Sequence, residues 1–383
     1  MPELTLEVPG RDHAHPLGWV VIDSLVRGRS HGGLRISHHV SSEELIVLAR
    51  RMTLKFGFLG LANGGAKAGI VGDPESSAEA RAKQLHDFAA AIRPLVESRK
   101  YLPHADMGTT EPEIRNAFGN LPRQPSREDS GYFTSIGVHL AAEVALSKRG
   151  KRLDQISGVV EGFGKVGASV AQLLAESGAR VVAISTSSGA LYRKEGLPIQ
   201  ELRRLAESRG SSFVSDYREA ERITNEDLLG LPADLLCPCA ISGTINAGNA
   251  PKIQAEIICP GANAPVSVEA HQLLADRGAV VLPDFITNAG GVLGGTMSFA
   301  GIPFSRIRPL MSEYLAPRFR MLFEQTPAEI EQYCLDRHQK NKIAAERGGV
   351  RQKLFETGIS LYRRGLVPRF LVGNLAENYF RSR

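Results

Sequence analysis

The chain has 383 residues, 43% hydrophobic and 23% charged, which is typical of a globular protein and long enough for two domains with separate cores. Lysine and arginine outnumber aspartate and glutamate by 46 to 41, but the basic residues are scattered, so we expect a small anionic ligand and no nucleic acid. The start MPELTLEVPGRDHAHP lacks the apolar segment of a signal peptide, and no apolar run is long enough to span a bilayer. These features predict a cytoplasmic protein that does not bind membranes.

The cysteines and histidines indicate neither a disulfide framework nor a metal site. Four cysteines are too few for such a framework, and one residue separates Cys237 from Cys239, where a zinc or redox pair has two. We expect reduced, mostly buried thiols. Eight of the ten histidines show no spacing typical of metal ligands, so no metal is expected.

The first amphipathic helix is predicted in SSEELIVLARRMTLK. It opens with a capping box formed by Ser41 and Glu44. Apolar residues then recur at helical spacing, at Leu45, Leu48, Ala49 and Met52. Lys55 falls on the border of this buried stripe, where a lysine either extends to solvent or meets an anion.

Lys67 lies in GLANGGAKAGIVGDP (60–74), a run too rich in glycine for a stable helix interior or a good strand. Asp106 follows in a separate loop, YLPHADMGTT. Lys55, Lys67 and Asp106 could form ordinary surface ion pairs. The glycines favour a functional site, because a surface lysine needs none.

From residue 134 onward, apolar runs alternate with amphipathic stretches, which predicts a parallel sheet with helical crossovers. The expected strands are 158–162, 180–185, 233–238, 256–261 and 279–284, with SFVSD (212–216) as a weaker candidate. These strands fit a doubly wound α/β fold. From about residue 304 to the end the pattern is again helical.

A dinucleotide-binding motif follows the first of these strands. Gly162, Gly164 and Gly167 form GxGxxG before a helix that stops at Gly178, with its inner stripe at Val166, Val170, Leu173 and Leu174. Strand, tight turn and helix N-terminus are the context in which this motif binds a pyrophosphate. A glycine-rich turn without a ligand is the weaker alternative.

The end of the second strand bears on cofactor choice. An NAD site usually has Asp or Glu there to hold the ribose hydroxyls, whereas this chain has Thr186, Ser187 and Ser188, with Arg193 and Lys194 a little further on. We therefore expect NAD or NADP as cofactor, with the 2′-phosphate of NADP tolerated.

Several motifs together resemble one enzyme family. HGGLRIS, MTLK, NGGAKAGIVGDP, HADMGTT, YFTSIGV, GFGKVG, GANAP and NAGGV occur in order over residues 31–292. They are similar to those of the glutamate, leucine, phenylalanine and valine dehydrogenases, and the first segments resemble the branched-chain and aromatic members most.

The resemblance implies roles for individual residues. It implies that Lys55 pairs with the substrate α-carboxylate, that Lys67 is the catalytic lysine and that Asp106 moves protons to and from the amino nitrogen. It further implies that Thr134 holds the nicotinamide amide, with Asn263 and Asn288 near the nicotinamide and its ribose. The complete expected cofactor-binding set is Thr134, Gly162, Phe163, Gly164, Lys165, Val166, Gly167, Thr186, Ser187, Ala240, Asn263 and Asn288.

The expected substrate pocket differs from that of the glutamate enzymes. Those carry a lysine immediately before the glycines Gly32 and Gly33, and a small polar residue seven positions after the asparagine of NAGG; this chain has His31 and Gly295 there. His104 stands where the relatives have a small residue. These changes argue against glutamate and favour a bulky or aromatic amino acid, although each histidine could instead be a hydrogen-bonded neighbour of the pocket.

The expected reaction converts an L-amino acid, water and NAD(P)⁺ to a 2-oxo acid, ammonium and NAD(P)H, reversibly. Lys67 and Asp106 fit the two proton transfers, and burial beside Lys55 would lower the pKa of Lys67 enough for it to act as a base. The glycines at 64, 65 and 69 are expected to let the backbone approach the substrate. Two rivals remain, namely a non-catalytic nucleotide-binding paralogue and a same-fold oxidoreductase acting on another keto acid or imine.

The expected fold is α/β with two domains and a cleft between them. Residues 1–133 form the substrate domain and residues 134–345 the Rossmann-type dinucleotide domain. Helices in 346–383 return to the substrate domain. A homo-oligomer is expected, with small molecules as the other partners.

Overall fold

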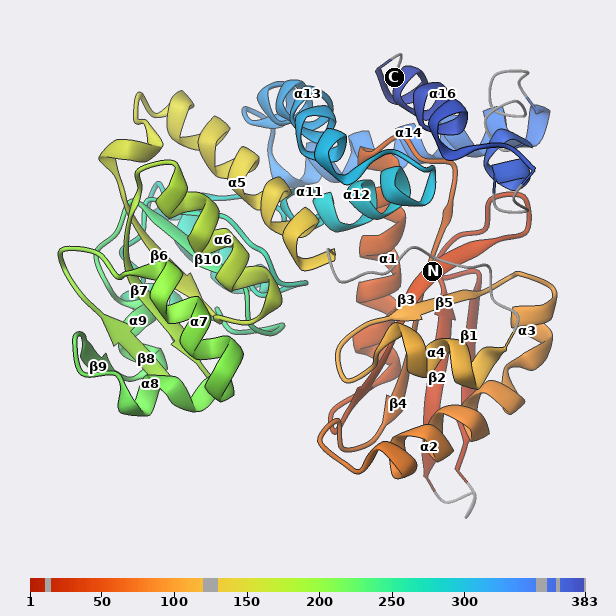
Figure 1. Cartoon of the computed structure of the whole chain (residues 1–383), viewed down its shortest axis with the longest axis horizontal. Coiled ribbons are helices and arrows are strands. Elements are labelled where there is room, and N and C mark those ends of the chain that lie inside the picture. The colour runs from red at the N-terminus through yellow and green to blue at the C-terminus, as the bar shows by residue number, and fades with distance from the viewer. Residues whose placement is uncertain (11–14, 120–129, 349–356, 363–365, 382–383) are drawn as a thin grey trace. The chain divides into compact units, whose positions relative to one another are not determined.

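The computed structural model describes residues 1–10, 15–119, 130–348, 357–362 and 366–381. The chain divides into two compact units (Figure 1). Unit 1 comprises Met1–Arg127, Ala328–Pro368 and Arg383, and unit 2 comprises Glu128–Pro327 and Arg369–Ser382.

Unit 1 is built on a mixed sheet of five strands in the order β1-β2-β4-β3-β5. β1, β2 and β4 pair antiparallel, whereas β3 pairs parallel with both β4 and β5. The elements are β1 Leu4–Pro9, β2 Pro16–Ile22, β3 Ser30–Ser37, α1 Ser42–Phe58, β4 Gly64–Val71, α2 Ala78–Ala91, α3 Arg93–Glu97, β5 Leu102–Ala105, α4 Glu111–Phe118 and α14 Pro327–Arg347.

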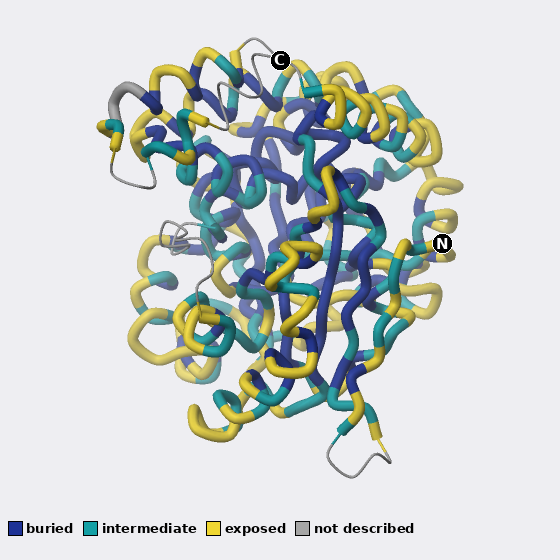
Figure 2. The backbone as a smooth tube through the Cα atoms, turned by 90° about the vertical axis from the view of Figure 1, so that its right-hand side faces the viewer, coloured by how far each residue is buried: buried dark blue, intermediate teal, exposed yellow. Residues whose placement is uncertain are grey.

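The two faces of this sheet pack against different helices. Ala66, Ala68 and Ile70 of β4 join an apolar core with Leu85 and Phe88 of α2. The alternate residues of β4 face α1, which packs closely on β4 and β2. All of β4 except Val71 is buried. Figure 2 shows the buried residues in dark blue along the chain. Side chains that point towards α1 are therefore removed from water.

The glycine-rich run around Lys67 is a central strand, so the expectation of irregular backbone there was wrong. Cβ atoms added at Gly64, Gly65 and Gly69 would lie 2.1 Å from the Ser24 oxygen, 2.3 Å from the Thr53 nitrogen and 2.6 Å from a Val40 methyl group. The glycines serve close packing of protein against protein. We had expected these glycines to let the backbone approach a ligand, and this expectation was wrong.

Unit 2 contains a sheet of seven strands in the order β12-β11-β10-β6-β7-β8-β9. The first five are parallel, and β8 and β9 continue the sheet antiparallel. The helices are α5 Ser130–Lys148, α6 Lys165–Glu176, α7 Ile199–Arg209, α8 Phe213–Asp216, α9 Asn225–Leu229, α10 Val268–Asp276, α11 Asp284–Thr287, α12 Gly290–Phe299, α13 Phe304–Leu322 and α16 Arg369–Arg381. The strands are β6 Ser157–Glu161, β7 Arg180–Thr186, β8 Gly189–Tyr192, β9 Glu221–Ile223, β10 Leu235–Pro238, β11 Ile257–Ile258 and β12 Val280–Val281.

The α/β class and the doubly wound parallel sheet were predicted correctly, but one strand was not. Residues 212–216 lie in a helical segment that includes α8, because Phe213 and Val214 turn inward together rather than alternately. The sheet instead continues through a hairpin in which Thr186 pairs with Gly189.

The C-terminal helices belong to different units. α14 contacts α1, since a Cβ added at Gly57 would lie 1.9 Å from the Cys334 oxygen. α16 packs on α13, where Phe380 contacts Tyr314 at a ring distance of 5.9 Å and Glu377 binds Arg306 at 2.7 Å. We had expected residues 346–383 to return to the first domain, whereas α16 packs in unit 2. Residues 349–356, 363–365 and 382–383 of that segment lie outside the described part.

No helix in the described ranges is both long enough and apolar enough to cross a membrane. All four cysteines are free thiols, and Cys237, Cys259 and Cys334 are buried.

Candidate active site

Lys67 and Asp106 form a buried ion pair on the α1-facing side of the first sheet. Lys67 lies in β4 and Asp106 directly follows β5, so the lysine reaches across β3 to place Nζ 2.6 Å from Asp106 Oδ2. Gly33 of β3 makes this possible, because a Cβ there would lie 3.2 Å from Lys67 Nζ and 2.8 Å from Asp106 Cβ. Gly32 points to the opposite face, against the backbone oxygen of Ala66.

Arg35 completes this cluster and was missed by the sequence analysis. Its Nε donates to the same oxygen, Asp106 Oδ2, at 3.0 Å, and its Nη1 binds Glu44 Oε1 at 2.5 Å. No strand was predicted there, and the signal that could have identified Arg35 is a charged residue between the apolar Leu34 and Ile36 of HGGLRIS. Glu44 was expected to complete the capping box with Ser41. It provides the backbone half, donating to Ser41 Oγ at 3.2 Å, but its carboxylate goes to Arg35.

Burial and neighbouring charges shift the pKa values of all three groups predicted to carry the chemistry. Burial lowers the pKa of Lys67, against the attraction of Asp106. For Asp106, burial alone would raise the pKa, but Lys67 and Arg35 outweigh it and hold it well below its usual range. Burial, with Lys67 and Arg51 nearby, lowers the pKa of Lys55 to about 7. Lys55 is 6% exposed, on α1.

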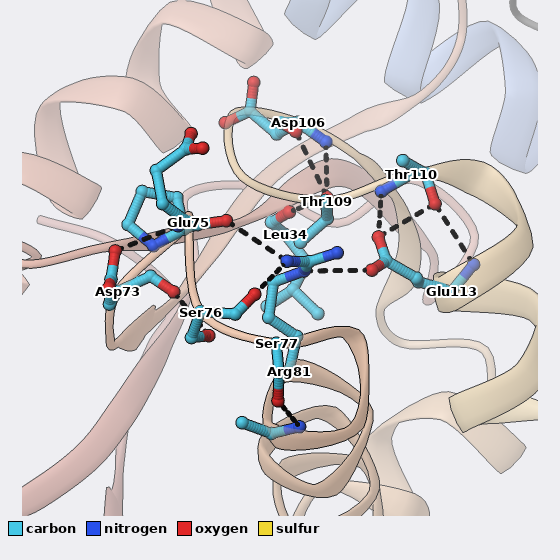
Figure 3. Close-up of polar contacts among 12 residues, drawn as sticks. Leu34, Asp73, Glu75, Ser76, Ser77, Arg81, Asp106, Thr109, Thr110 and Glu113 are labelled. Atoms are coloured by element: carbon cyan, nitrogen blue, oxygen red, sulfur yellow. Dashed lines mark hydrogen bonds and ion pairs between the residues drawn. The ribbon is translucent and has the colours of Figure 1, made fainter.

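The loop that carries Asp106 is fixed by hydrogen bonds (Figure 3). The Asp106 amide donates to Thr109 Oγ1 at 2.9 Å, and that hydroxyl donates to the Leu34 oxygen at 2.8 Å. Thr110 and Glu113 form a capping box at the start of α4, and Arg81 of α2 binds Glu113 at 3.1 Å. The loop after β5 is thus tied to both β3 and α2.

His31 and His104 lie side by side on β3 and β5. Their rings stack with centroids 5.6 Å apart and planes 14° apart, and His31 Nδ1 lies 3.3 Å from His104 Nε2. Phe56 of α1 contacts the His31 ring edge-on, with centroids 6.3 Å apart. Gly295 belongs to the other unit, on α12, and a Cβ added there would meet nothing within 4 Å.

The GxGxxG turn in unit 2 has the geometry expected of a pyrophosphate site. Gly162 has φ +88°, and a Cβ there would lie 2.7 Å from Ala240. A Cβ at Gly167 would lie 1.7 Å from the Gly162 oxygen. Gly164 is the N-cap of α6 without a side-chain cap, and a Cβ there would meet nothing within 4 Å. The first amides of α6 therefore face open space, which fits a dinucleotide.

The other expected cofactor residues differ in exposure and in their hydrogen bonds. Phe163 turns inward against Phe213, so only its backbone can line the turn, whereas Lys165 is exposed and Val166 half-buried. Asn288 Nδ2 donates to Asn263 Oδ1 at 3.1 Å, and Asn288 Oδ1 is buried with no partner among the described residues. This acceptor suits an amide or hydroxyl donor. Thr134 Oγ1 donates to the Ser130 oxygen at 2.9 Å.

Glu161, which the sequence analysis also missed, lies beside this turn. It is 7% exposed and accepts from the Ala240 amide at 3.2 Å, and burial raises its pKa. An acidic residue at the end of a predicted buried strand was the available signal.

The end of β7 presents hydroxyl groups. Thr186 Oγ1 donates to the Ser211 oxygen at 3.1 Å and accepts from the Ser188 amide at 3.1 Å, and Ser187 sits exposed at the tip of the hairpin. Arg193 and Lys194 are not near this end. β8 runs back along β7, so the Arg193 amide reaches the Val182 oxygen near the beginning of that strand.

Within the described residues, no group of three histidine, cysteine, aspartate or glutamate side chains is arranged to hold a metal ion.

Two family models match nearly the whole chain. "Glu/Leu/Phe/Val dehydrogenase, dimerisation domain" matches residues 4–123, and "Glutamate/Leucine/Phenylalanine/Valine dehydrogenase" matches residues 127–351. The protein belongs to the Glu/Leu/Phe/Val dehydrogenase family.

Individual relatives agree with this assignment. The NADP-specific glutamate dehydrogenase of Saccharolobus shibatae is 30% identical over 80% of this chain and 78% of the relative. The glutamate dehydrogenase of Thermotoga maritima is 34% identical over 76% of this chain and 74% of the relative. The crystal structure of the hetero-hexameric glutamate dehydrogenase of Thermus thermophilus in its Leu-bound form has a TM-score of 0.65 and 25% identity, and the match covers 100% of this chain and 89% of that one.

The protein is therefore an NAD(P)-dependent amino-acid dehydrogenase, as predicted. These curated relatives are glutamate dehydrogenases, so they do not support the expected closeness to the leucine and phenylalanine branch.

Proposed function

We propose that the protein catalyses reversible oxidative deamination of an L-amino acid with a bulky or aromatic side chain. The observation that carries this proposal is the buried Lys67–Asp106 pair at 2.6 Å, with Lys55 buried nearby and the His31–His104 stack on the same face of the sheet.

Each of the three charged groups has a task in this reaction. The Lys55 ammonium binds the α-carboxylate. A nicotinamide, when bound, would supply the acceptor for the hydride of the α-carbon. Asp106 accepts a proton from the substrate ammonium before the hydride leaves. Lys67, unprotonated, takes a proton from the water that attacks the resulting iminium carbon, and Asp106 then returns its proton to the departing amine. The lowered pKa of Lys67 supports its role as a base near neutral pH.

The histidine stack and Phe56 support the choice of side chain. Aromatic rings offer apolar surface and stacking partners to a bulky substrate, which gains about 25 cal/mol for each Å² of apolar surface buried. A second substrate carboxylate would have no lysine at position 31 to offset its desolvation, which costs several kcal/mol. Gly295, which stands where the glutamate enzymes have a small polar residue, would leave room for a larger side chain.

A substrate panel tests this proposal. Oxidation of NAD(P)H with ammonium is measured across 2-oxo acids with aromatic, branched and acidic side chains. We expect the aromatic or bulky acids to exceed 2-oxoglutarate in kcat/KM. His31→Lys should shift the preference towards 2-oxoglutarate, and Gly295→Leu should shift it towards short aliphatic acids. A wild-type panel led by 2-oxoglutarate would assign the protein to glutamate instead.

We further propose that NADP(H) serves at least as well as NAD(H). The hydroxyl-bearing end of β7 has no carboxylate in Thr186, Ser187 or Ser188 to repel a 2′-phosphate. Titration of both cofactors at saturating substrate tests this, with Thr186→Asp as a variant expected to favour NAD(H). A hundredfold wild-type preference for NAD(H) would contradict it.

The two rival functions give different results in the same assays. A non-catalytic paralogue would bind the dinucleotide but turn over none of the panel. An enzyme for another keto acid or an imine would be active only when ammonium is replaced by a preformed imine or a different carbonyl compound.

A further inference from the structure

We infer that Arg35, held in place by Glu44, is a positioning residue that prevents the Asp106 carboxylate from retaining the proton of Lys67. This inference rests on the proposed function and assigns roles to two residues outside the proton-transfer pair.

The geometry of the cluster is the first argument. Lys67 Nζ and Arg35 Nε approach the same oxygen, Asp106 Oδ2, at 2.6 Å and 3.0 Å. Two cations therefore share one acceptor, which weakens the hold of the carboxylate on either. None of the described residues donates to Oδ1, which leaves that oxygen for the substrate amino group.

The fixation of Arg35 is the second argument. Its side chain is 5% exposed, so the guanidinium is desolvated and needs compensating partners. Asp106 provides one partner, at Nε, and Glu44 the other, at Nη1. Since Glu44 lies in the first turn of α1 and its side chain is 30% exposed, α1 both orients Arg35 and connects the cluster to solvent.

The balance of charge around Lys67 is the third argument. Asp106 and Glu44 favour the protonated form of Lys67 and thereby raise its pKa, whereas Arg35 opposes it. Lys55 is a second nearby cation, and the repulsion between it and Lys67 lowers the Lys55 pKa. Other ionisable groups near the cluster, within the described residues, are Arg51, which acts on Lys55, Tyr101, on which Asp106 acts, and the His31–His104 stack on the same face of the sheet.

Opposite charges on Arg35 and Glu44 predict opposite effects of removing them. Without Arg35, Asp106 acts on Lys67 alone and the lysine keeps its proton to higher pH. Without Glu44, an attraction for that proton is lost, so the lysine releases it at lower pH. A purely structural role would predict a lower activity in both variants and no shift of the pH profile in either.

The experiment measures kcat/KM for amino-acid oxidation against pH in the wild type, Arg35→Gln, Glu44→Gln and the double variant. We expect the acid limb to move to higher pH in Arg35→Gln by about one unit, with a loss of about tenfold in kcat/KM below the limb. In Glu44→Gln it should move to lower pH, and in the double variant it should return towards the wild-type position. Arg35→Lys keeps the charge but not the fork, so it should keep the limb and lower kcat.

Arg306→Gln is the matched control. Arg306 forms an arginine–carboxylate pair with Glu377 at 2.7 Å in the other unit, and neither residue holds the loop that carries Asp106. This variant should leave the limb in place. Thermal unfolding of every variant checks that it is folded, and Glu44→Gln alone still tests the inference if Arg35→Gln does not fold. Shifts of the same sign in Arg35→Gln and Glu44→Gln, or no shift in folded variants, would overturn it. An inactive wild type would instead refute the proposed function.

Discussion

At the scale of single residues, Lys67 faces two opposed requirements. The ion pair with Asp106 needs its protonated form, whereas a base needs its neutral form. Burial at 4% exposure disfavours the charge and lowers the pKa of Lys67, whereas Asp106 favours the charge. A substrate amino group bound to the Asp106 carboxylate would weaken its attraction for Lys67 and so favour the neutral lysine.

Removing either proton-transfer group should abolish turnover. Lys67→Met and Asp106→Asn keep the approximate shape and remove the charge, and we expect kcat to fall by about 10²–10⁴ or more. Dissociation constants for NAD(P)H should stay within a few-fold of the wild type, because both residues lie in the other unit from the GxGxxG turn. Fluorescence titration of the cofactor and pre-steady-state kinetics measure the two quantities. Wild-type kcat in either variant would disprove its assigned role.

Lys55 predicts a pH dependence for carboxylate binding. Its pKa of about 7 means that the ammonium is present below pH 7 and lost above it. The inhibition constant of a carboxylic acid with the substrate side chain but no amino group should therefore be constant below pH 7 and rise about tenfold per unit above it. Lys55→Arg stays charged, so its inhibition constant should be nearly flat to pH 9. A flat profile in the wild type would show that Lys55 does not bind the carboxylate.

At the scale of elements, β4 combines a catalytic position with tight packing on α1. Its glycines allow the helix backbone to approach the sheet, and this approach is what buries Lys67 and Lys55 together. The same residue type has another purpose in α6, where Gly164 leaves a helix N-terminus uncovered. The surroundings of each glycine therefore distinguish its role.

Two glycine-to-alanine changes in central strands should differ in sign or size. Gly65→Ala places a Cβ 2.3 Å from the Thr53 nitrogen, which is backbone of α1 and cannot yield, so we expect unfolding free energy to fall by about 1–3 kcal/mol or more. At Gly158 of β6 the nearest atom is Leu174 Cδ1 at 3.7 Å. Gly158→Ala should therefore be neutral or stabilising by about 0.5–1 kcal/mol. Denaturant unfolding compares them, and equal losses would contradict the packing explanation.

Gly164→Ala should affect cofactor binding without affecting folding. A Cβ at this position meets no protein atom within 4 Å, but it would stand where the α6 amides are expected to face a pyrophosphate. We expect the dissociation constant for NAD(P)H to rise at least tenfold while the thermal midpoint changes little. If the affinity were unchanged, the pyrophosphate would have to lie elsewhere.

At the scale of the whole molecule, each unit contains a buried histidine whose pKa is lowered by burial, His338 in unit 1 and His139 in unit 2. His338 of α14 is 5% exposed in unit 1, and His139 of α5 is 9% exposed in unit 2, with Nε2 2.8 Å from Ser177 Oγ. Burial lowers the pKa of both to about 4. Acid must therefore charge a buried ring in either unit.

This predicts loss of stability in mild acid. Because the folded pKa values are below the usual value, the two histidines favour folding above about pH 6.5, and this contribution is lost as the pH falls towards 4. Each could account for about 3 kcal/mol at full protonation. The free energy of unfolding is measured in urea between pH 7.5 and 4.5. Its dependence on pH should become weaker in His338→Leu but not in His39→Gln, since His39 is exposed. If His338→Leu kept the wild-type dependence of the unfolding free energy on pH, His338 would not be a source of the acid sensitivity.

The sequence by itself determined the α/β class, the dinucleotide turn and the residues Lys67, Asp106 and Lys55 as candidates, because these depend on local periodicity and on short motifs whose spacing is a property of the backbone. Only the tertiary structure decided what surrounds them. Arg35 and Glu44 join the cluster because β3, lying between β4 and β5, and the start of α1 meet there in space. The glycine-rich run around Lys67 forms a packed strand. Arg193 lies far from the end of β7, because β8 runs antiparallel to that strand. Contacts between segments distant in sequence depend on how the sheet is ordered, and no local pattern encodes that order.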